Sequence, residues 1–235
     1  MTSAQALVVG ASSDIGRAIA LEVARLGHAV TLWGRRRAAL AEAAADCQAL
    51  GVSVEVDVID VTDGDQLRRG LDRVTGRGPL RTVVWTPGLF DWARADAADP
   101  ETWRGVMDVN VTAPAVFTAL VAPFLVRAAP STLIYLGSGA GHQAFPFNAA
   151  YVASKHGLTG LARATFLDLR DADVKVSLVS PGMVAAGPSL ASPTGQSRPQ
   201  ELLAVDDVVA AVRFVLTSSR SCCPTEIQLQ PQRSP

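Results

Sequence analysis

"ALVVGASSDIGRAIALEVARLG", residues 6–27, joins an apolar run to a helical pattern through a short turn. Residues 6–11 are almost continuously apolar, as in a buried strand, and residues 14–27 have helical spacing that ends at a glycine. A buried strand followed at once by a helix is the repeating unit of an α/β fold. The rest of the chain can be tested against that unit.

The same alternation continues to the end of the chain. Further strands are expected at 29–34, 52–58, 81–86, 131–137, 174–180 and 225–230, and further helices at 36–50, 64–75, 101–127, 149–171 and 205–217. Strands without period-two polarity are typical of a parallel sheet covered on both faces. Right-handed crossovers then predict one doubly wound, Rossmann-like α/β domain over 1–235, with about seven strands and helices on both faces.

Composition excludes several classes of protein. The net charge is −1 and both signs are interspersed, which argues against a nucleic-acid partner, with Arg35-Arg36-Arg37 as a local exception. No uninterrupted run of 18 apolar residues and no signal-peptide pattern occur, so neither a membrane span nor secretion is expected. The three cysteines predict reduced thiols in a cytoplasmic protein, and no metal-ligand motif is present.

The first turn, "VVGASSDIG" (8–16), has a glycine pair at Gly10 and Gly16. In this architecture such a turn lets backbone N–H groups approach a pyrophosphate at a helix N-terminus. Two glycines also suit an ordinary turn between a strand and a helix, so this stretch alone leaves cofactor binding open.

The helix expected at 149–171 places Tyr151 and Lys155 on one face. Both residue types are scarce: the chain has two tyrosines, and only Lys155 and Lys175 among its 21 basic residues are lysines. A phenol with a pKa of about 10 is a poor acid or base near neutrality, and a nearby ammonium lowers that pKa. The alternative is an ordinary amphipathic pair on a helix.

Further segments match one family in order and spacing. Ser138 lies thirteen residues before Tyr151, Asn110 lies in "DVNVTAP", and "SPG" spans 180–182. With the glycine turn and the YxxxK pattern, the sequence resembles a short-chain dehydrogenase/reductase over nearly its whole length. The resemblance implies an oxidoreductase that transfers hydride to or from a nicotinamide dinucleotide.

The resemblance implies a role for each catalytic residue. Tyr151 exchanges the proton of the carbonyl or alcohol oxygen, and Ser138 hydrogen-bonds that oxygen. Lys155 lowers the pKa of Tyr151 and holds the nicotinamide ribose, where the fork of an arginine is not equivalent. Asn110 positions a water in a proton relay with Lys155.

The resemblance also implies the cofactor contacts. Cofactor choice is expected at the end of the second strand, where Gly34 replaces the carboxylate typical of NAD-binding folds and Arg35 follows. Arg35 therefore predicts NADP(H), through its pairing with the 2′-phosphate. The alternative, expected for Arg36 and Arg37, is the solvated start of a helix. The predicted contacts are Gly10, Ser12, Ser13, Asp14, Ile15, Gly16, Arg35, Asp60, Val61, Gly88, Tyr151, Lys155, Pro181, Gly182 and Val184.

The chain departs from the family pattern mainly in the cofactor cradle. Val9 replaces a threonine, Asp14 replaces a glycine, and "WTPG" (85–88) stands where NNAG is expected. Ala186 replaces a threonine common near the nicotinamide amide, and the C-terminal segment lacks the usual glycine pair. These changes bear on dinucleotide affinity and leave the proton-transfer residues intact.

The substrate side is rich in apolar and aromatic residues, which suits an apolar, ring-containing ketone; ordinary packing is the alternative. A substrate loop is expected at about 183–203. His142 is expected as a polar wall residue rather than a second acid. The residues past the strand ends are Leu89, Phe90, Trp92, His142, Phe145, Phe147, Met183 and Leu190.

The main hypothesis is an NADP(H)-dependent carbonyl reductase or alcohol dehydrogenase acting on a small apolar ketone or secondary alcohol. A dinucleotide-binding regulator with little turnover is the alternative, and oxidation is the alternative direction. The alanine-rich helices at 101–127 and 149–171 could pack against other copies, which predicts a homodimer or homotetramer.

Overall fold

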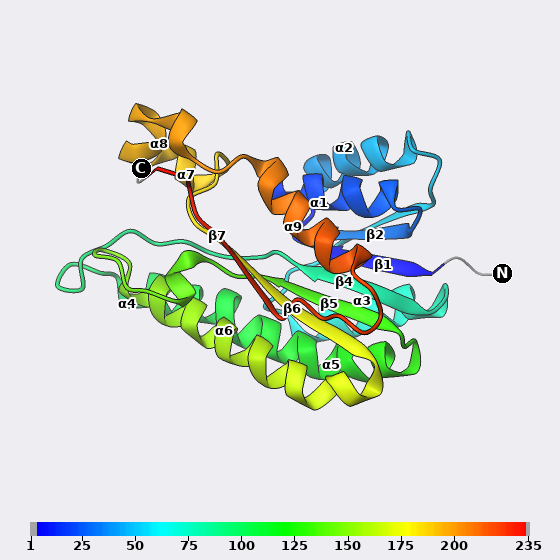
Figure 1. Ribbon diagram of the computed structural model, residues 1–235. Helices are drawn as coiled ribbons and strands as arrows, with labels where there is room; N and C mark the ends of the chain where they lie inside the picture. Colours follow the sequence, from blue (N-terminus) through cyan, green and yellow to red (C-terminus); the bar gives the residue numbers. More distant parts are fainter. Residues whose placement is uncertain (1–3, 234–235) are drawn as a thin grey trace.

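The computed structural model describes residues 4–233 and contains one sheet of seven parallel strands (Figure 1). The strand order is β3-β2-β1-β4-β5-β6-β7, so the chain winds outward from β1 in one direction and from β4 in the other. The predicted doubly wound α/β fold is therefore confirmed. The strands are β1 (Gln5–Val9), β2 (Ala29–Gly34), β3 (Val54–Val58), β4 (Leu80–Trp85), β5 (Ser131–Leu136), β6 (Val174–Pro181) and β7 (Glu226–Leu229).

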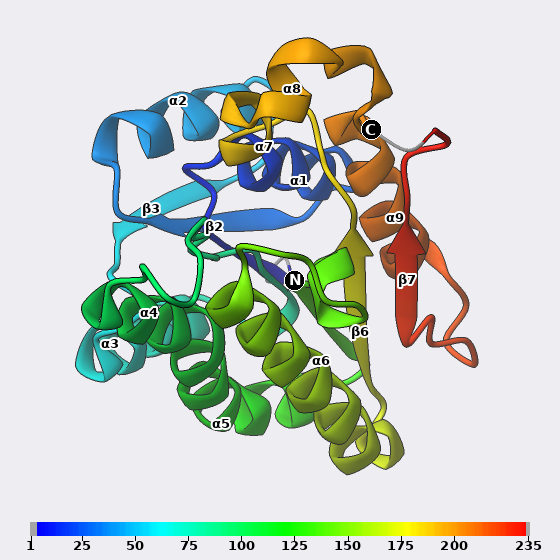
Figure 2. The ribbon, with the colours of Figure 1, turned by 90° about the vertical axis from the view of Figure 1, so that its left-hand side faces the viewer.

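Helices cover both faces of the sheet (Figures 1 and 2). Each face has its own apolar core, since strands buried on both sides need a helix layer on each. One layer contains α1 (Asp14–Arg25), α2 (Arg37–Gln48) and α9 (Val205–Thr217). The other contains α3 (Gly64–Gly76), α4 (Pro100–Met107), α5 (Ala113–Arg127) and α6 (Ala149–Leu169).

The helix expected at 101–127 has an irregular middle. A π-helical turn, η1 (Asp108–Thr112), joins α4 to α5 and contains Asn110. Single π-turns inside helices are frequent at functional sites. Asn110 therefore marks a position where regular helix geometry was given up.

Pro100–Arg127 is also long and apolar enough to pass a length and composition test for a membrane span, at a mean hydropathy of 1.8. No membrane-spanning segment is expected from the sequence, because no uninterrupted run of 18 apolar residues occurs. Phe117, Val121 and Leu125 of this helix are fully buried in the core beneath the sheet. Packing against the sheet accounts for these apolar residues.

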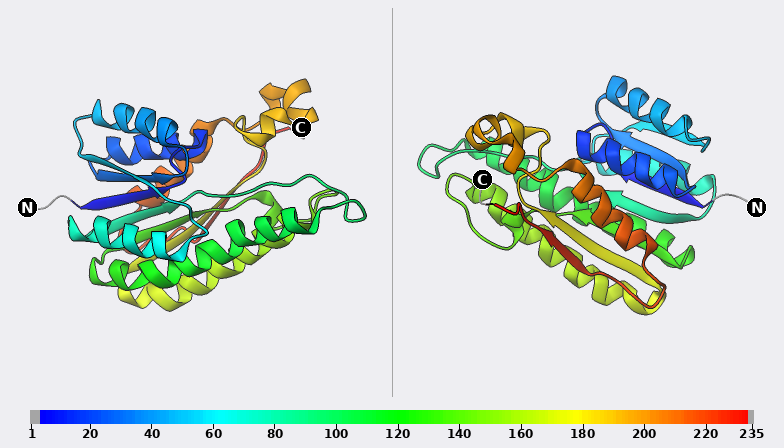
Figure 3. Two further views of the ribbon diagram at one scale, coloured as in Figure 1. Left: turned by 180° about the vertical axis from the view of Figure 1, so that it is seen from behind. Right: turned by 45° about the horizontal axis from the view of Figure 1, so that its top comes forward.

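The segment after β6 is not the plain loop that was expected. It contains the short helices α7 (Pro188–Ala191) and α8 (Pro193–Ser197) and the 3₁₀ turn η4 (Pro199–Glu201). An isolated parallel bridge between Val184 and Leu203 brings its two ends together. The segment therefore forms a compact excursion, drawn in orange beyond the sheet (Figure 3).

Candidate active site

The four predicted catalytic residues come from three neighbouring elements. Ser138 follows β5 and begins the 3₁₀ turn η2 (Gly139–Gly141), while Tyr151 and Lys155 lie in the first two turns of α6. Asn110 reaches the same region from η1, because its side chain hydrogen-bonds Leu89 beyond β4 and Ser154 of α6. The carboxyl ends of parallel strands are where such folds bind ligands.

Lys155 is buried in this region, with 4% of its surface exposed. Its Nζ donates to the Leu136 carbonyl at 3.2 Å and lies 5.7 Å from the centroid of the Tyr151 ring. Burial lowers the pKa of Lys155 to about 8. A Cβ at Gly88 would lie 3.4 Å from this nitrogen, so Gly88 leaves room for the ammonium.

Ser138 lies close enough to Tyr151 for a side-chain hydrogen bond that lowers the pKa of the Tyr151 phenol. Burial raises the same pKa and is the larger effect, so the net shift is upward. The expected lowering by Lys155 is not among the causes of this shift, since desolvation of the phenolate dominates it. Tyr151 is therefore held as a neutral phenol near pH 7.

The Asn110 side chain acts as a clamp. Its Oδ1 accepts from the Leu89 N–H at 2.7 Å, and its Nδ2 donates to the Leu89 carbonyl at 2.8 Å and to Ser154 Oγ at 2.9 Å. Ser154 Oγ in turn donates to the Tyr151 carbonyl at 2.7 Å. These bonds join the segment after β4 to α6, so the Asn110 side chain holds the two segments together.

The scarcity of lysine and tyrosine in this chain does not by itself identify the catalytic residues. Lys175 Nζ donates to the Ser218 carbonyl at 2.8 Å and to its hydroxyl at 2.7 Å, so it fastens β6 to the end of α9. Tyr135 is fully buried and hydrogen-bonded to Thr118, and burial raises its pKa to about 12. The second lysine and the second tyrosine are structural.

The glycine turn fits a close approach to a dinucleotide. Gly10 has φ +86°, and a Cβ there would lie 2.3 Å from Thr86 Oγ1. A Cβ at Gly16 would lie 2.2 Å from the Gly10 carbonyl oxygen. Both positions therefore require glycine. Ser13 is the N-cap of α1, because its Oγ accepts from the Gly16 N–H at 3.1 Å.

The end of β2 has a glycine where NAD-binding folds place a carboxylate. A Cβ at Gly34 would lie 2.8 Å from Ser12 Oγ, so a side chain there would require the Ser12 side chain to move. Arg35 is exposed, and its charge contributes to lowering the pKa of Asp60, after the backbone hydrogen bond from Thr62, which is the largest cause. Arg35 therefore lies within electrostatic range of the predicted adenine side.

Arg36 is not simply a solvated residue at a helix start. Its guanidinium donates to the Ser12 carbonyl of the glycine turn. The sequence analysis missed this contact, because it joins residues 24 positions apart in sequence. Arg36 thus adds a second positive charge beside the predicted phosphate site.

Asp14 faces away from the turn toward the excursion after β6. Its Oδ2 accepts from the Gly187 N–H at 3.3 Å. The substitution that departs from the family pattern thus joins the first turn of α1 to the predicted substrate loop. Ile15, beside it, packs its side chain against the core rather than toward a ligand.

The nicotinamide-side segment is fixed by β7. Pro181 ends β6 opposite Leu229, and the Gly182 N–H donates to the Leu229 carbonyl at 2.7 Å. Val184 and Ala186 are buried in the core, so any contact they make with a cofactor is through the backbone.

Two more predicted positions border the cradle. Val61 lies after β3 and lines a cavity of about 280 Å³ together with Asp108 and Val116. Thr86, which replaces part of the family's NNAG segment, is buried and donates through Oγ1 to the Val9 carbonyl at 2.7 Å. Its hydroxyl thereby ties β4 to β1.

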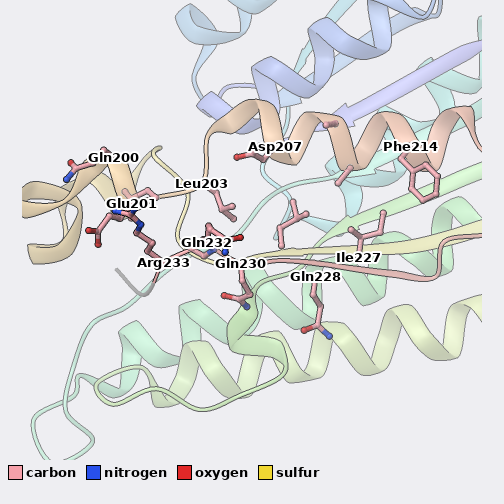
Figure 4. Close-up of a pocket in the computed structure, with 15 residues that line it drawn as sticks. Gln200, Glu201, Leu203, Asp207, Phe214, Ile227, Gln228, Gln230, Gln232 and Arg233 are labelled. Atoms are coloured by element: carbon pink, nitrogen blue, oxygen red, sulfur yellow. The ribbon is translucent and has the colours of Figure 1, made fainter.

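A larger cavity of about 880 Å³ lies between α9 and β7 (Figure 4). None of the four predicted catalytic residues lines it. Gln230 connects its wall to the site: its Nε2 lies 3.2 Å from a Cβ at Gly139, and its Oε1 lies 2.9 Å from one at Gly182. No sequence pattern predicted a position for Gln230 near the site, although the C-terminal segment that contains it lacks the glycine pair usual in the family.

On the substrate side, the exposed rings of Phe90, Trp92 and Phe147 gather near Tyr151. His142 points elsewhere, with its Nε2 at 3.5 Å from Glu226 Oε1 on β7. It is therefore a contact between η2 and β7. Within residues 4–233 no group of three or more His, Cys, Asp or Glu side chains could hold a metal.

Comparison with known proteins identifies the family. The model of the short chain dehydrogenases matches residues 4–194, and the chain belongs to this family. An uncharacterized oxidoreductase of Myxococcus xanthus is 37% identical over 187 residues, which cover 78% of this chain and 73% of that protein.

Two further similarities concern chemistry. The granaticin polyketide synthase putative ketoacyl reductase 1 of Streptomyces violaceoruber is 34% identical over 183 residues, covering 76% of this chain and 67% of that protein. The X-ray structure of an alcohol dehydrogenase from the archaeon Thermococcus sibiricus, complexed with 5-hydroxy-NADP, is 25% identical with a TM-score of 0.88. That similarity covers 99% of this chain and 98% of the other.

Proposed function

We propose that the protein is an NADP(H)-dependent carbonyl reductase that reduces an apolar ketone to a secondary alcohol. The observation that carries the proposal is Tyr151 next to Ser138, with the buried Lys155 Nζ 5.7 Å from the centroid of the Tyr151 ring. This arrangement offers two hydroxyl groups to one substrate oxygen and a positive charge behind them. The proposal covers residues 1–235 as a single domain.

Each residue has a defined part in the proposed reaction. The nicotinamide, when bound, supplies the hydride. Ser138 donates a hydrogen bond to the carbonyl oxygen and stabilises the negative charge that develops on it. Tyr151 gives its phenolic proton to that oxygen. Lys155 stabilises the phenolate that Tyr151 becomes.

The proposed direction is reduction. The similarity to a putative ketoacyl reductase supports this direction. Burial raises the pKa of Tyr151, which is compatible with a phenol that donates its proton to a carbonyl oxygen.

NADP(H) is the proposed cofactor. Arg35 and Arg36 supply positive charge at the end of β2, and Gly34 stands where NAD-binding folds place a carboxylate. The complex of the Thermococcus sibiricus enzyme with an NADP analogue supports the assignment. A regulator with little turnover is the weaker alternative, because the sequence keeps Asn110, Ser138, Tyr151 and Lys155.

We also propose a homodimer or homotetramer formed through α5 and α6. Three large apolar side chains on these helices remain exposed in one chain: Val116, Val126 and Leu167, at 40%, 40% and 59%. Light scattering after size exclusion tests this, and a monomer at micromolar concentration would contradict it.

The function is tested with purified protein, NADPH or NADH, and a panel of apolar ketones, with cofactor absorbance followed over time. Turnover that prefers NADPH and disappears in Tyr151→Phe is expected. Tight NADPH binding without turnover of any ketone would instead favour the regulator.

A further inference from the structure

Four aromatic rings form a continuous series that starts at the proposed acid. The Phe90 ring lies edge-on to Tyr151 with centroids 5.0 Å apart, and Trp92 lies 6.2 Å from Phe90. Trp92 stacks on Phe147 at 5.7 Å. We call Tyr151, Phe90, Trp92 and Phe147 the aromatic ladder.

The ladder is exposed although its rings are large and apolar. Phe90, Trp92 and Phe147 keep 39%, 58% and 40% of their surface in contact with solvent. A contiguous exposed apolar patch is a mark of a binding site. Tyr151 begins the patch, so a ligand there lies beside the proposed acid.

The backbone holds the rings in place. The Ala93 N–H donates to the Phe147 carbonyl at 2.9 Å, and a parallel bridge pairs Ala93 with Asn148. Phe147 has φ +62°, a left-handed conformation that is unfavourable for a bulky side chain. Strain kept at a position that aims a ring onto Trp92 indicates function.

Charged groups beside the ladder are already paired. Asp91 accepts from Trp103 Nε1 at 3.0 Å. Arg94 and Asp96 form a two-bond ion pair, at 2.9 and 3.0 Å. Lys155 lies 5.7 Å from the Tyr151 ring at the inner end of the ladder, whereas the charged groups near the outer rings are paired with other side chains, so the outer surface suits a neutral ligand.

We propose that the aromatic ladder selects ketones whose carbonyl carbon carries an aromatic ring system, and that Phe90 and Trp92 determine this specificity. The inference rests on the proposed reductase function. Phe90 contacts Tyr151, so it lies beside a ring attached directly to the carbonyl. Trp92 lies one step farther out and contacts a second, fused ring.

Aromatic pairs contribute beyond the area they bury, because the edge of one ring attracts the face of another. The aryl preference should therefore fall about two- to tenfold in kcat/KM when one ring of the ladder is removed. A saturated substrate of the same skeleton gains only from burial and should lose less.

The experiment compares two matched pairs with NADPH: acetophenone with cyclohexyl methyl ketone, and 2-acetonaphthone with its decalin counterpart. The quantity is the ratio of kcat/KM within each pair, divided by the wild-type ratio, which cancels intrinsic ketone reactivity. Phe90→Leu should lower the ratio in both pairs. Trp92→Leu should lower it only in the naphthyl pair.

Phe214→Leu is the matched control. Phe214 lies on α9 and is 55% exposed, and no ring contact involves it among residues 4–233. Its selectivity ratios should equal those of the wild type. Equal ratios in all three variants, or the same change in Phe214→Leu as in Trp92→Leu, would overturn the proposal.

A binding measurement separates this inference from the proposed function. Equilibrium dialysis gives the affinity of 2-acetonaphthone and of its decalin counterpart for the protein with NADP⁺. Preference for 2-acetonaphthone that Trp92→Leu removes supports the ladder even if no ketone turns over. Absence of that preference overturns the ladder even if ketones are reduced.

Discussion

The β1–β3 half of the sheet and the β4–β6 half hold their functional side chains differently. In the β4–β6 half, Asn110 and Lys155 are almost fully buried and hydrogen-bonded to backbone. In the β1–β3 half, Asp14, Arg35 and Arg36 are exposed. Proton transfer needs fixed geometry, whereas phosphate binding relies on backbone N–H groups and on exposed charged side chains.

This difference bears on where the chain departs from its family. The residues predicted for proton transfer match the family pattern, whereas Val9 and Asp14 depart from it in the β1–β3 half and Pro87 departs from it after β4. Substitutions of the predicted catalytic residues in the β4–β6 half should therefore abolish turnover, and those in the β1–β3 half should only shift cofactor affinity.

Tyr151→Phe should have the largest effect. The substitution keeps the ring beside Phe90 but removes the proton that the substrate oxygen requires. The kcat should fall about a hundred- to ten-thousandfold, the usual contribution of general acid catalysis. NADPH affinity, measured by cofactor fluorescence, should stay nearly unchanged. Turnover within a few fold of the wild type would remove Tyr151 from its role.

Lys155→Arg should be almost as damaging, although the charge is kept. Lys155 is buried and its Nζ lies 3.2 Å from the Leu136 carbonyl, so a wider guanidinium cannot take the same position. Displacing the ribose contact by about 1 Å costs about a hundredfold in kcat. Near-normal rates in steady-state assays would show that only charge matters at 155.

Arg35→Ala tests the β1–β3 half of the sheet. Loss of a charge-assisted pair of about 1.5–3 kcal/mol should weaken NADPH binding roughly ten- to a hundredfold and NADH binding little. Arg36→Ala is the companion variant, since its guanidinium also contacts the Ser12 carbonyl. Equal losses for both cofactors, measured by fluorescence titration, would exclude Arg35 from phosphate recognition.

Lys155→Met should show how much burial of the Lys155 ammonium lowers the free energy of unfolding. Burial lowers the pKa of Lys155 to about 8 from its ordinary 10.5. Between these values only the unfolded chain binds the proton, so wild-type stability rises with pH relative to the variant. The free energy of unfolding of the variant should therefore exceed that of the wild type most clearly below pH 8, and this difference should disappear as the pH approaches 10.5.

Urea unfolding at pH 7 and pH 10 measures that change. Lys175→Met is the matched control for the loss of one lysine, and its nitrogen contacts Ser218 instead. A stability difference between wild type and Lys155→Met that does not vary with pH would contradict the prediction.

The sequence predicted the fold because the signal repeats along the whole chain. Every strand lies within about two residues of its expected position, since strands buried on both faces leave long apolar runs. The π-turn at Asp108–Thr112 was not predicted, because it depends on contacts of Asn110 with Leu89 and Ser154. The helices within 188–201 were missed because their proline and serine content resembles a loop.

The candidate site was predictable only as a set of residues. Spacing identified Ser138, Tyr151 and Lys155, but not the direction of the Tyr151 pKa, which depends on burial. Arg36 and Gln230 contact the cradle through partners distant in sequence, so no local pattern could identify them.

Asp14→Gly should have the smallest effect, and its sign decides what the departure means. The substitution restores the family's residue and removes a negative charge near the predicted pyrophosphate, so dinucleotide affinity should rise or stay level. It also removes the acceptor for the Gly187 N–H, which should loosen the 183–203 segment. Exposed hydrogen bonds are weak, about 0.5–1.5 kcal/mol, so the loosening should appear as a few-fold faster hydrogen exchange there.

Asp14→Asn separates the two effects, because the amide keeps an acceptor for Gly187 while the charge is lost. If charge governs affinity, Asn and Gly should raise it equally, and only Gly should speed exchange in 183–203. A sharp fall in NADPH affinity in both variants, with the fold intact, would show that the carboxylate itself serves the cofactor. The β1–β3 half would then depend on the residue at position 14 as strongly as the β4–β6 half depends on Tyr151.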